Sequence, residues 1–323
     1  MAHSGDIVTL GGGQYRLREQ LAGSSYGVVW RAEGGHGEVA LKLVNREQMG
    51  RAPAALQARW TECAAREIAF LSSLAPWDAR HIVRMLDHGR HEGLPALALE
   101  LLDGDLAAYV GARHGAGERI GLARALAWLA QVNAALAKVH QHGWRYLDLK
   151  PGNLLVDAAG GRLKLADFGT NRSLVDASLH SYAGTASWQA PEQFFQREAG
   201  GYLTDARSDY FALGAILFYL VTDGATLRYH GACADAFREH GSQGAARLHG
   251  AWEGAPAPVL AEDEADHFLR CAGAEGAGDP AAALALLRAL LAWLPQDRPR
   301  HALEISRLIA AARDQALPAR RAA

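Results

Sequence analysis

The sequence has few cysteines and no arrangement of them that suggests a cross-linked or metal-bound fold. Cys63, Cys233 and Cys271 lie far apart, and no two of them form a C-x-x-C pair. The sequence therefore indicates neither a zinc site nor a disulfide framework. This pattern is typical of a protein from a reducing compartment, so we expect a cytoplasmic location.

Long apolar runs and a charge excess are also absent. The longest apolar run, from about Tyr210 to Val221, is much shorter than the ~20 residues of a membrane span. Residues 1–6 carry no basic region, and no long apolar stretch of a secretory signal follows them. A formal net charge of -2 gives no overall field that attracts nucleic acid. We therefore expect neither a membrane span nor a nucleic-acid partner.

Length and pattern predict two regions of different character. The 323 residues, half of them hydrophobic, are sufficient for two domains. The first third contains strand-like runs separated by turns, with one helical pattern from about Leu56 to Leu74. After residue 103 the apolar residues recur at helical spacing, as at Leu122, Leu126 and Leu129. The expected strands are 15–17, 28–30, 39–44, 82–86 and 94–101.

A short segment between a helical pattern and a pair of short strand-like runs combines residues suited to phosphoryl transfer. Asp148 can accept the proton of an attacking hydroxyl group, and Lys150 can offset charge on the moving phosphoryl group. Asn153 supplies an amide oxygen, which suits Mg²⁺. The alternative, a helix-ending aspartate beside an incidental lysine, does not explain why Asp167-Phe168-Gly169 follows. The pattern predicts a phosphotransferase that uses Mg-ATP.

The segment resembles the catalytic loop H-R-D-L-x-x-x-N of eukaryotic-type (Hanks-type) protein serine/threonine kinases, and Asp167 opens a motif like their D-F-G. The resemblance implies an α+β, two-lobed protein-kinase-like fold. Its N-lobe would be a small, antiparallel, β-rich domain with one main helix, and its C-lobe would be large and mainly helical. We expect the N-lobe over residues 14–102, the C-lobe over 103–315, and flexible termini at 1–13 and 316–323. Abundant alanine, glycine and arginine favour a bacterial source.

Further motifs resemble those of this family and extend the comparison over most of the chain. Val39-Ala40-Leu41-Lys42 resembles V-A-I-K, and its lysine would pair with Glu67, with Glu62 as the alternative. Ala190-Pro191-Glu192 resembles A-P-E, the end of the activation segment. Three later landmarks complete the set: Arg298 would pair with Glu192, Asp209 would hold the backbone of the catalytic loop, and Thr185 would bond to Asp148 and Lys150.

The resemblance also implies the ligands and the residues that contact them. The ligands would be ATP and Mg²⁺, with Mn²⁺ as an alternative metal. Asn153 and Asp167 would bind the metal, and the catalytic residues would be Asp148, Lys150, Lys42 and Glu67. Leu99 would lie behind the adenine. The residues expected to contact the nucleotide are Ala22, Gly23, Gly27, Val29, Ala40, Lys42, Glu100, Leu102, Asp105 and Leu155.

The glycine loop departs from the family pattern. Ala22 and Ser24 stand where G-x-G-x-x-G-x-V has its first two glycines, which reduces backbone freedom. This is the only feature that favours the alternative of a pseudokinase, a scaffold that binds nucleotide without significant transfer. The stretch also matches G-x-S-x-G, with Ser25 as a serine-hydrolase nucleophile. That motif needs a strand, a sharp turn and then a helix, whereas here a strand pattern continues.

A second departure concerns regulation. Leu147 stands where the family usually has an arginine that pairs with a phosphorylated residue of the activation segment. We therefore expect that this ion pair does not switch the enzyme on. Lys150 and Gly184-Thr185 resemble serine/threonine kinases rather than tyrosine kinases, and the A-P-E motif argues against a small-molecule kinase. Candidate autophosphorylation positions, each also explicable as a solvated loop serine, are Ser173, Ser178, Ser181 and Ser187.

Residues 224–280 fit the family least well, although the resemblance places a substrate-docking helix there. His230, His240 and His249 are expected to be solvated. Asp263, Glu264 and Asp266 form an acidic group that is interpreted as a solvated helix face, with selection of a basic partner as the alternative.

Overall fold

The computed structural model describes residues 2–314, except for 25, 158–160, 181, 183, 198–199, 252–257 and 275. The chain divides into two compact units. The first comprises Met1–Asp103 together with Leu165–Asn171, and the second comprises Gly104–Lys164 together with Arg172–Ala323. The expected C-terminal tail, 316–323, lies outside the described residues.

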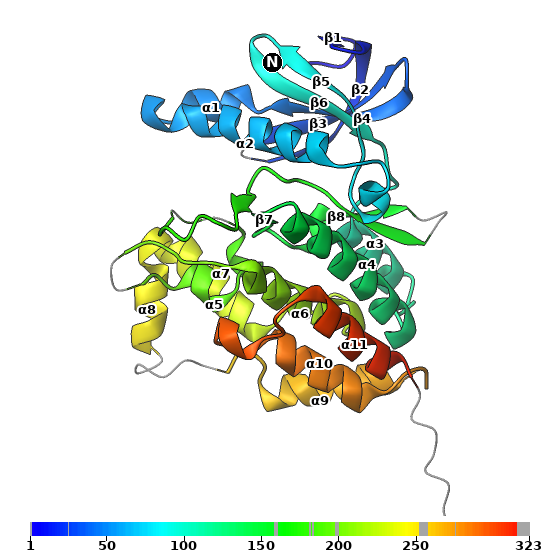
Figure 1. Cartoon of the computed structure of the whole chain (residues 1–323), viewed down its shortest axis with the longest axis vertical. Coiled ribbons are helices and arrows are strands. Elements are labelled where there is room, and N and C mark those ends of the chain that lie inside the picture. The colour runs from blue at the N-terminus through cyan, green and yellow to red at the C-terminus, as the bar shows by residue number, and fades with distance from the viewer. Residues whose placement is uncertain are drawn as a thin grey trace, which may run out of the picture. The chain divides into compact units, whose positions relative to one another are not determined.

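The first unit is built on an antiparallel sheet of six strands in the order β1-β2-β3-β4-β6-β5 (Figure 1). Alternation along β4 buries Val39, Leu41 and Leu43 in a core on one face of the sheet, where they pack with Trp30. The elements of this unit are β1 (Ile7–Leu10), β2 (Gly13–Gly23), β3 (Gly27–Gly34), β4 (Gly37–Val44), α1 (Arg46–Arg51), α2 (Ala54–Ser73), the 3-10 turn η1 (Asp78–His81), β5 (Met85–His91) and β6 (Leu94–Glu100).

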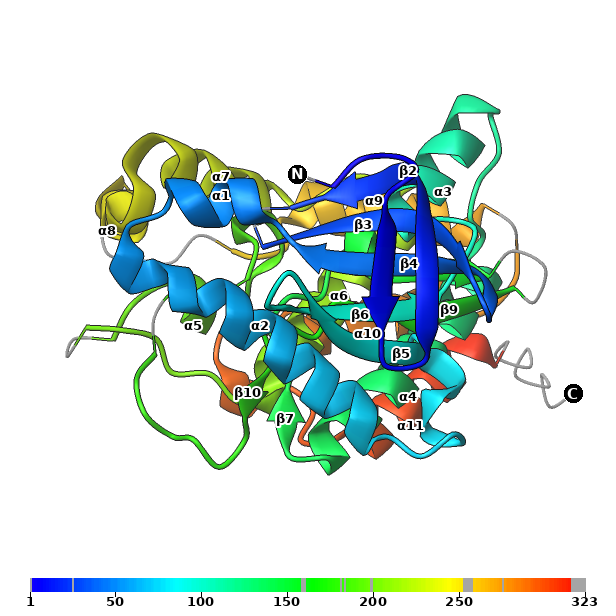
Figure 2. The same cartoon turned by 90° about the horizontal axis from the view of Figure 1, so that it is seen from above.

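The long helix α2 lies alongside the sheet, as Figure 2 shows. Its sequence contains several good helix formers, and its buried residues recur at helical spacing. These residues, Trp60, Glu67, Phe70 and Leu71, include one charged side chain among three apolar ones. A charge on the buried face of a helix requires a partner, and Glu67 is therefore the position at which α2 contributes chemistry as well as packing.

Two expectations about the first unit were wrong. Residues 7–10 are not a flexible terminus, because they pair with β2 and bury Val8 completely. The β1–β2 turn is fixed by Asp87, which accepts hydrogen bonds from Gly12 N and Tyr15 Oη, each at 2.9 Å. The strand expected at 82–86 instead begins at Met85 and runs to His91, while Ile82 forms an isolated bridge with Leu165. The sequence did not predict β1, because the two buried residues of this strand are too few to give a readable periodicity.

The second unit is helical and is organised around α6 (Ala206–Val221), the uninterrupted apolar run of the sequence. Nearly every residue of α6 is buried, because α4, α9 and α10 all contact it. Asp205 caps its first turn by accepting from Arg207 N at 2.7 Å. None of the helices among the described residues is long and apolar enough to cross a membrane.

The remaining elements of the second unit include three helices in the stretch that the sequence left unassigned. Those helices are α7, α8 and α9, and they fall within residues 224–280. The elements are α3 (Leu106–Gly115), α4 (Leu122–Gln141), β7 (Trp144–Arg145), η2 (Pro151–Asn153), β8 (Leu154–Asp157), β9 (Arg162–Leu165), β10 (Arg172–Ser173), η3 (Ala186–Trp188), α5 (Pro191–Phe194), α7 (Arg228–His240), η4 (Gly241–Gln243), α8 (Gly244–Ala251), α9 (Glu262–Gly273), α10 (Pro280–Leu290), η5 (Pro295–Asp297) and α11 (Ala302–Arg313).

Candidate active site

In the first unit the structure brings Lys42, Glu67 and Asp167 together. Lys42 Nζ lies 2.7 Å from Glu67 Oε2 and 2.8 Å from Asp167 Oδ1. Lys42 projects from β4, and Glu67 lies on the buried face of α2. Glu62, the alternative partner, is exposed on the same helix. The geometry therefore selects Glu67 over Glu62 as the partner of Lys42.

The charged side chains of this group shift the pKa values of Lys42 and Glu67. Burial by itself would lower the pKa of the Lys42 ammonium, but the Asp167 and Glu67 carboxylates outweigh it and raise that pKa above its ordinary value. Burial raises the pKa of the Glu67 carboxyl group, and the Lys42 ammonium opposes this shift. Because the pKa of Lys42 is raised, the lysine stays cationic at neutral pH. A fixed cation beside two carboxylates is suited to binding phosphate oxygens.

Helix α2 also holds the segment that follows Asp167. Phe168 N donates to Glu67 Oε1 at 3.3 Å, and the Phe168 ring packs on Phe70 with centroids 4.5 Å apart. Arg66, the neighbour of Glu67, donates from its guanidinium to Gly169 O at 3.0 Å. Sequence reasoning missed this role of Arg66. These contacts hold Asp167 in a left-handed conformation, with φ 59°.

In the second unit Asp148 lies at the centre of a hydrogen-bonded group of polar side chains. Lys150 Nζ donates to Asp148 Oδ2 at 2.8 Å, and Thr185 Oγ1 donates to Asp148 Oδ1 at 2.7 Å. Lys150 Nζ also reaches Thr185 Oγ1 at 2.8 Å, which closes the triangle. The structure thus joins Thr185 to Asp148 and Lys150, as the resemblance implied. A lysine and a hydroxyl group fix the orientation of the carboxylate.

Asn153 completes this group from the 3-10 turn η2. Its Nδ2 donates to the Asp148 carbonyl oxygen at 2.8 Å and to Asp148 Oδ2 at 3.1 Å. Because the amide nitrogen makes both bonds, the amide oxygen of Asn153 is the atom suited to a metal ion. Asp167 in the first unit offers a carboxylate that is 42% exposed. Each of these oxygens is a hard donor of the kind that Mg²⁺ and Mn²⁺ prefer.

The backbone that carries Asp148 is clamped on both sides of Leu147. Asp209, on α6, accepts from Tyr146 N at 2.8 Å and from Leu147 N at 2.7 Å. The Leu147 carbonyl accepts from Gln193 Nε2 at 2.9 Å. Leu147 adopts φ 69°, a strained value for a non-glycine residue that the bonds on either side maintain. Asp209 thus makes the contact that the resemblance implied.

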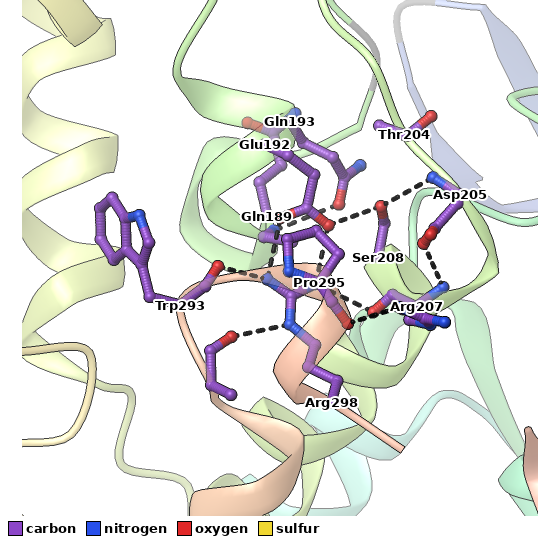
Figure 3. Close-up of polar contacts among 12 residues, drawn as sticks. Gln189, Glu192, Gln193, Thr204, Asp205, Arg207, Ser208, Trp293, Pro295 and Arg298 are labelled. Carbon is purple, nitrogen blue, oxygen red and sulfur yellow. Dashed lines mark hydrogen bonds and ion pairs between the residues drawn. The ribbon is translucent and has the colours of Figure 1, made fainter. Parts of the chain in front are cut away.

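The end of the activation segment is fixed by a buried ion pair. Arg298 Nη1 lies 2.7 Å from Glu192 Oε1, and Arg298 Nη2 lies 2.9 Å from Glu192 Oε2 (Figure 3). Ser208 Oγ also donates to Glu192 Oε1 at 2.6 Å. The remaining guanidinium bonds go to the carbonyl oxygens of Ala292, Trp293 and Arg207. Every charge of this buried pair is therefore hydrogen-bonded.

The residues expected to contact the nucleotide in the first unit lie on one face of the sheet. Lys42 pairs in register with Val29, and Ala40 pairs with Leu99, so that these four side chains point the same way. Glu100 closes β6 and accepts from Arg84 N at 2.7 Å. Leu102, which follows β6, is half-buried in this unit. The face opposite the sheet's apolar core thus carries Lys42 and its neighbours.

The glycine loop is a closed β2–β3 turn. Ala22 and Gly23 end β2, and Gly27 begins β3. Ser24, one of the residues that replaces a glycine, accepts from Gly27 N through its Oγ at 3.1 Å. Ser25 lies outside the described residues, but β3 follows the turn, so the strand–turn–helix order of a serine hydrolase is not present here.

The tip of this loop is tethered in a way that the sequence did not reveal. Asn45 Nδ2 donates to Ser24 O at 2.7 Å, and Asn45 N donates to Tyr26 O at 3.1 Å. The Tyr26 ring lies 5.0 Å from the ring of Trp60 on α2. These contacts attach Ser24 and Tyr26 to Asn45 and to α2.

Asp105 and Leu155, the nucleotide-contact candidates of the second unit, form an antiparallel bridge with each other. Asp105 caps α3 by accepting from Ala108 N at 2.8 Å through its Oδ1. Val156 N bonds to Gly104 O at 2.8 Å, which extends the contact between the two segments. The structure therefore places Asp105 and Leu155 next to each other.

One interpretation of residues 224–280 requires revision. His230 is not solvated but fully buried on α7, where it lies 3.3 Å from Gln189 O and burial lowers its pKa to about 4. Asp263 and Asp266 are exposed, as expected of a solvated helix face, and Arg228 binds Asp263 and Glu264. His240 and His249 are exposed, as expected. Of the candidate serines, Ser181 lies outside the described residues.

Comparison with known proteins identifies the family. The family model described as "Protein kinase domain" matches residues 15–306. The chain is 32% identical over 218 residues to the serine/threonine-protein kinase ATG1c of Arabidopsis thaliana, a match that covers 65% of this chain and 27% of that protein. It is 31% identical over 217 residues to the serine/threonine-protein kinase PknJ of Mycobacterium tuberculosis, covering 65% of this chain and 34% of that protein.

These relatives are much longer than the region they share with this chain, which spans about a third or less of their length. Among solved structures, a chain in "Structure of the CAK complex form Chaetomium thermophilum bound to ATP-gamma-S" has a TM-score of 0.64. It is 22% identical and covers 90% of this chain and 88% of its own, so it shows a common fold. Because the family model spans most of the sequence and the fold agrees, this chain belongs to the protein kinase domain family.

Proposed function

We propose that the chain is a protein serine/threonine kinase that transfers the γ-phosphate of Mg-ATP to Ser or Thr hydroxyl groups of proteins, with itself as one possible acceptor. The observation that carries the proposal is the closed triangle of Asp148, Lys150 and Thr185. It combines a carboxylate that can accept a proton with a lysine that can balance charge, and both are held in fixed orientation.

In this proposal Asp148 orients the acceptor hydroxyl group and accepts its proton as the new bond to phosphorus forms. Lys150 provides positive charge on the same side, where negative charge develops on the transferred group. Thr185 prevents the Asp148 carboxylate from rotating, because it binds Oδ1 while Lys150 binds Oδ2. Positioning of this kind accounts for much of the catalysis of phosphoryl transfer.

Lys42, fixed by Glu67, would bind the α- and β-phosphates, and Asn153 and Asp167 would hold the metal. When bound, Mg²⁺ supplies positive charge that neutralises the phosphates. The residues proposed to contact adenine and ribose are Val29, Ala40, Glu100, Leu102, Asp105 and Leu155. Ala22, Gly23 and Gly27 would cover the phosphates, with the loop held by Asn45.

A protein acceptor is favoured over a small molecule because Glu192 and Arg298 anchor an activation segment on which a polypeptide can dock. The separate cysteines, which form no disulfide among the described residues, support a cytoplasmic location. The two lobes are proposed to correspond to the two compact units, so that β1, Asp103 and Leu165–Asn171 belong to the N-lobe instead of the expected limits of 14–102 and 103–315.

The test is transfer of label from γ-labelled ATP to protein acceptors in a lysate and to the kinase itself, followed by phosphoamino-acid analysis. We expect phosphoserine and phosphothreonine. Label recovered only in phosphotyrosine or in small metabolites would reject the proposed acceptor class. Nucleotide binding without any transfer would instead identify a pseudokinase.

A further inference from the structure

Arg145 is a buried cation that no motif of the family accounted for. It forms the end of β7, two positions before Leu147, and only 2% of its surface is exposed. Burying a guanidinium group is costly unless its N–H groups are bonded. Burial also lowers the pKa of Arg145 from its ordinary value, and the Arg172 guanidinium contributes to this shift. The groups that Arg145 binds therefore indicate its role.

Those partners are backbone carbonyl oxygens on both flanks of the activation segment. Arg145 Nη2 donates to Asp176 O at 2.8 Å, and Arg145 Nη1 donates to Thr204 O at 2.5 Å. Asp176 follows the D-F-G motif within the activation segment, and Thr204 lies after the end of that segment, next to Asp205, the N-cap residue of α6. Because carbonyl oxygens are permanent parts of the backbone, this connection requires no covalent modification.

The same two flanks are joined a second time. His180 and Tyr202 form an antiparallel bridge, with N···O distances of 2.9 and 3.0 Å. The His180 ring lies 2.9 Å from Thr204 Oγ1. The contacts of Arg145 and this bridge together define the clasp of the activation segment, which comprises Arg145, Asp176, His180, Tyr202 and Thr204.

A carboxylate of the chain itself supplies the negative charge beside the clasp. Arg172 pairs with Arg145 across the β7–β10 ladder, and its Nη2 donates to Asp176 Oδ2 at 3.2 Å. Asp176 also accepts hydrogen bonds from the hydroxyl group and the backbone N–H of Ser178, which lower the pKa of Asp176 to about 2. Asp176 is therefore ionised at neutral pH without a phosphate group.

We infer that Arg145 is a positioning residue that, with Asp176, orders the activation segment, so that the enzyme is active without phosphate on that segment. The inference rests on the proposed kinase function. Leu147 cannot bind a phosphate, and a phosphate on Ser178 would place additional negative charge against the Asp176 carboxylate, to which Ser178 is bonded. A phosphate on Ser178 would thus lie beside a carboxylate that Arg172 already neutralises.

The first test uses the wild-type chain. Phosphatase treatment, verified by intact mass, gives a phosphate-free form, and incubation with Mg-ATP gives the phosphorylated form. We expect kcat/KM for a protein acceptor to agree within about twofold between the two forms. A phosphorylated form that is about tenfold or more faster would overturn the inference while leaving the proposed function intact. No transfer by either form, despite ATP binding, would reject the proposed function, and the inference with it.

The second test separates positioning from general stability. Arg145→Met should reduce kcat/KM for the protein acceptor by about tenfold or more, since it removes two charge-assisted hydrogen bonds. The Kd of a fluorescent ATP analogue should stay within about twofold, because Lys42 and Asp167 belong to the other unit. Equal losses of nucleotide binding and transfer would instead indicate a merely structural role and would contradict the inference.

Matched variants distinguish a loss of positioning from a folding defect. Asp176→Ala leaves both carbonyl bonds of Arg145 in place but removes the charge that Arg172 binds, so it should show a smaller loss in the same parameter. Arg145→Lys retains a cation and should recover part of the activity lost in Arg145→Met. Arg288→Met is the control, since Arg288 forms an exposed pair with Glu262. Wild-type activity in Arg145→Met would overturn the inference.

Discussion

The guanidinium group of Arg298 binds both carboxylate oxygens of Glu192, although 106 residues separate them. The pair is buried, and its remaining donors reach backbone carbonyl groups near η5 and α6 (Figure 3). The activation segment therefore ends at a fixed point of the helical unit. An ion pair of this kind stabilises a specific arrangement more than it stabilises the fold as a whole, because both charges had to be desolvated.

Removal of one partner of the Glu192–Arg298 pair should strongly destabilise the protein. Arg298→Met leaves the Glu192 carboxylate buried without its cation, so we expect the free energy of unfolding to fall by about 3–5 kcal/mol. Chemical denaturation in urea measures this change. Arg288→Met, at an exposed pair, should cost less than about 1 kcal/mol. An effect of Arg298→Met no larger than that of the control would contradict a structural role for the pair.

Gly184 should not tolerate a side chain. Its φ is +99°, and a Cβ atom there would lie 2.6 Å from Leu147 O, the carbonyl next to Asp148. Gly184→Ala should therefore displace the catalytic loop and destabilise the protein by about 2 kcal/mol or more. Thermal unfolding and transfer activity measure the two effects. Gly231→Ala, at an open position in α7, should leave stability unchanged or raised, and similar behaviour of the two variants would refute the steric argument.

Glu67 and Glu62 offer a matched comparison on one helix. Glu67→Gln removes the carboxylate that binds Lys42 Nζ, so kcat/KM for transfer should fall about 10- to 100-fold. Glu62→Gln, at an exposed position, should change it by less than about twofold. Steady-state kinetics at varied ATP concentration provide the measurement. A larger effect at Glu62 would mean that the wrong glutamate has been assigned to Lys42.

His230 should make stability dependent on pH. Its pKa is about 4 in the folded protein because the ring is buried, against an ordinary value of 6.5. Below pH 6.5 the unfolded chain takes up a proton that the folded protein does not, so stability is lost as pH falls from 6.5 towards 4. The loss should total about 3 kcal/mol and then level off.

The pH effect of His230 is isolated by comparison with His230→Leu. Urea unfolding of both proteins between pH 8 and pH 4 gives two curves, and their difference should grow only below about pH 6.5. Since the other titrating groups are common to both proteins, they cancel in this difference. Parallel curves over the whole range would show that His230 is already protonated in the folded state or is not buried.

The parts predicted from sequence are those that short, fixed motifs encode. Lys42, Asp148 and Asp167 were proposed as site residues from residue type and local order alone, without knowledge of the tertiary structure. Long-range partners were also located where a motif specified both ends, as for Glu192 and Arg298. Some elements were expected at nearly their observed bounds, as for α2 and β6.

The parts that the sequence did not predict depend on tertiary contacts. His230 lies on a polar-looking helix, yet it is buried because α7 packs against η3. Arg145 looks like an ordinary charged residue until the carbonyl oxygens of Asp176 and Thr204 are seen around it. The strand β1 has too few residues to show a period. In each case the information lies in a distant segment, which local pattern cannot report.

The most direct test of the central claim is phosphate transfer by wild type and by Asp148→Asn, measured with γ-labelled ATP and a protein acceptor. The substitution keeps the size of the side chain but removes the group that accepts the proton. We expect kcat to fall about 10²- to 10⁴-fold while the Kd for ATP is nearly unchanged. Equal transfer by both proteins would contradict the assignment of Asp148 and the kinase mechanism built on it.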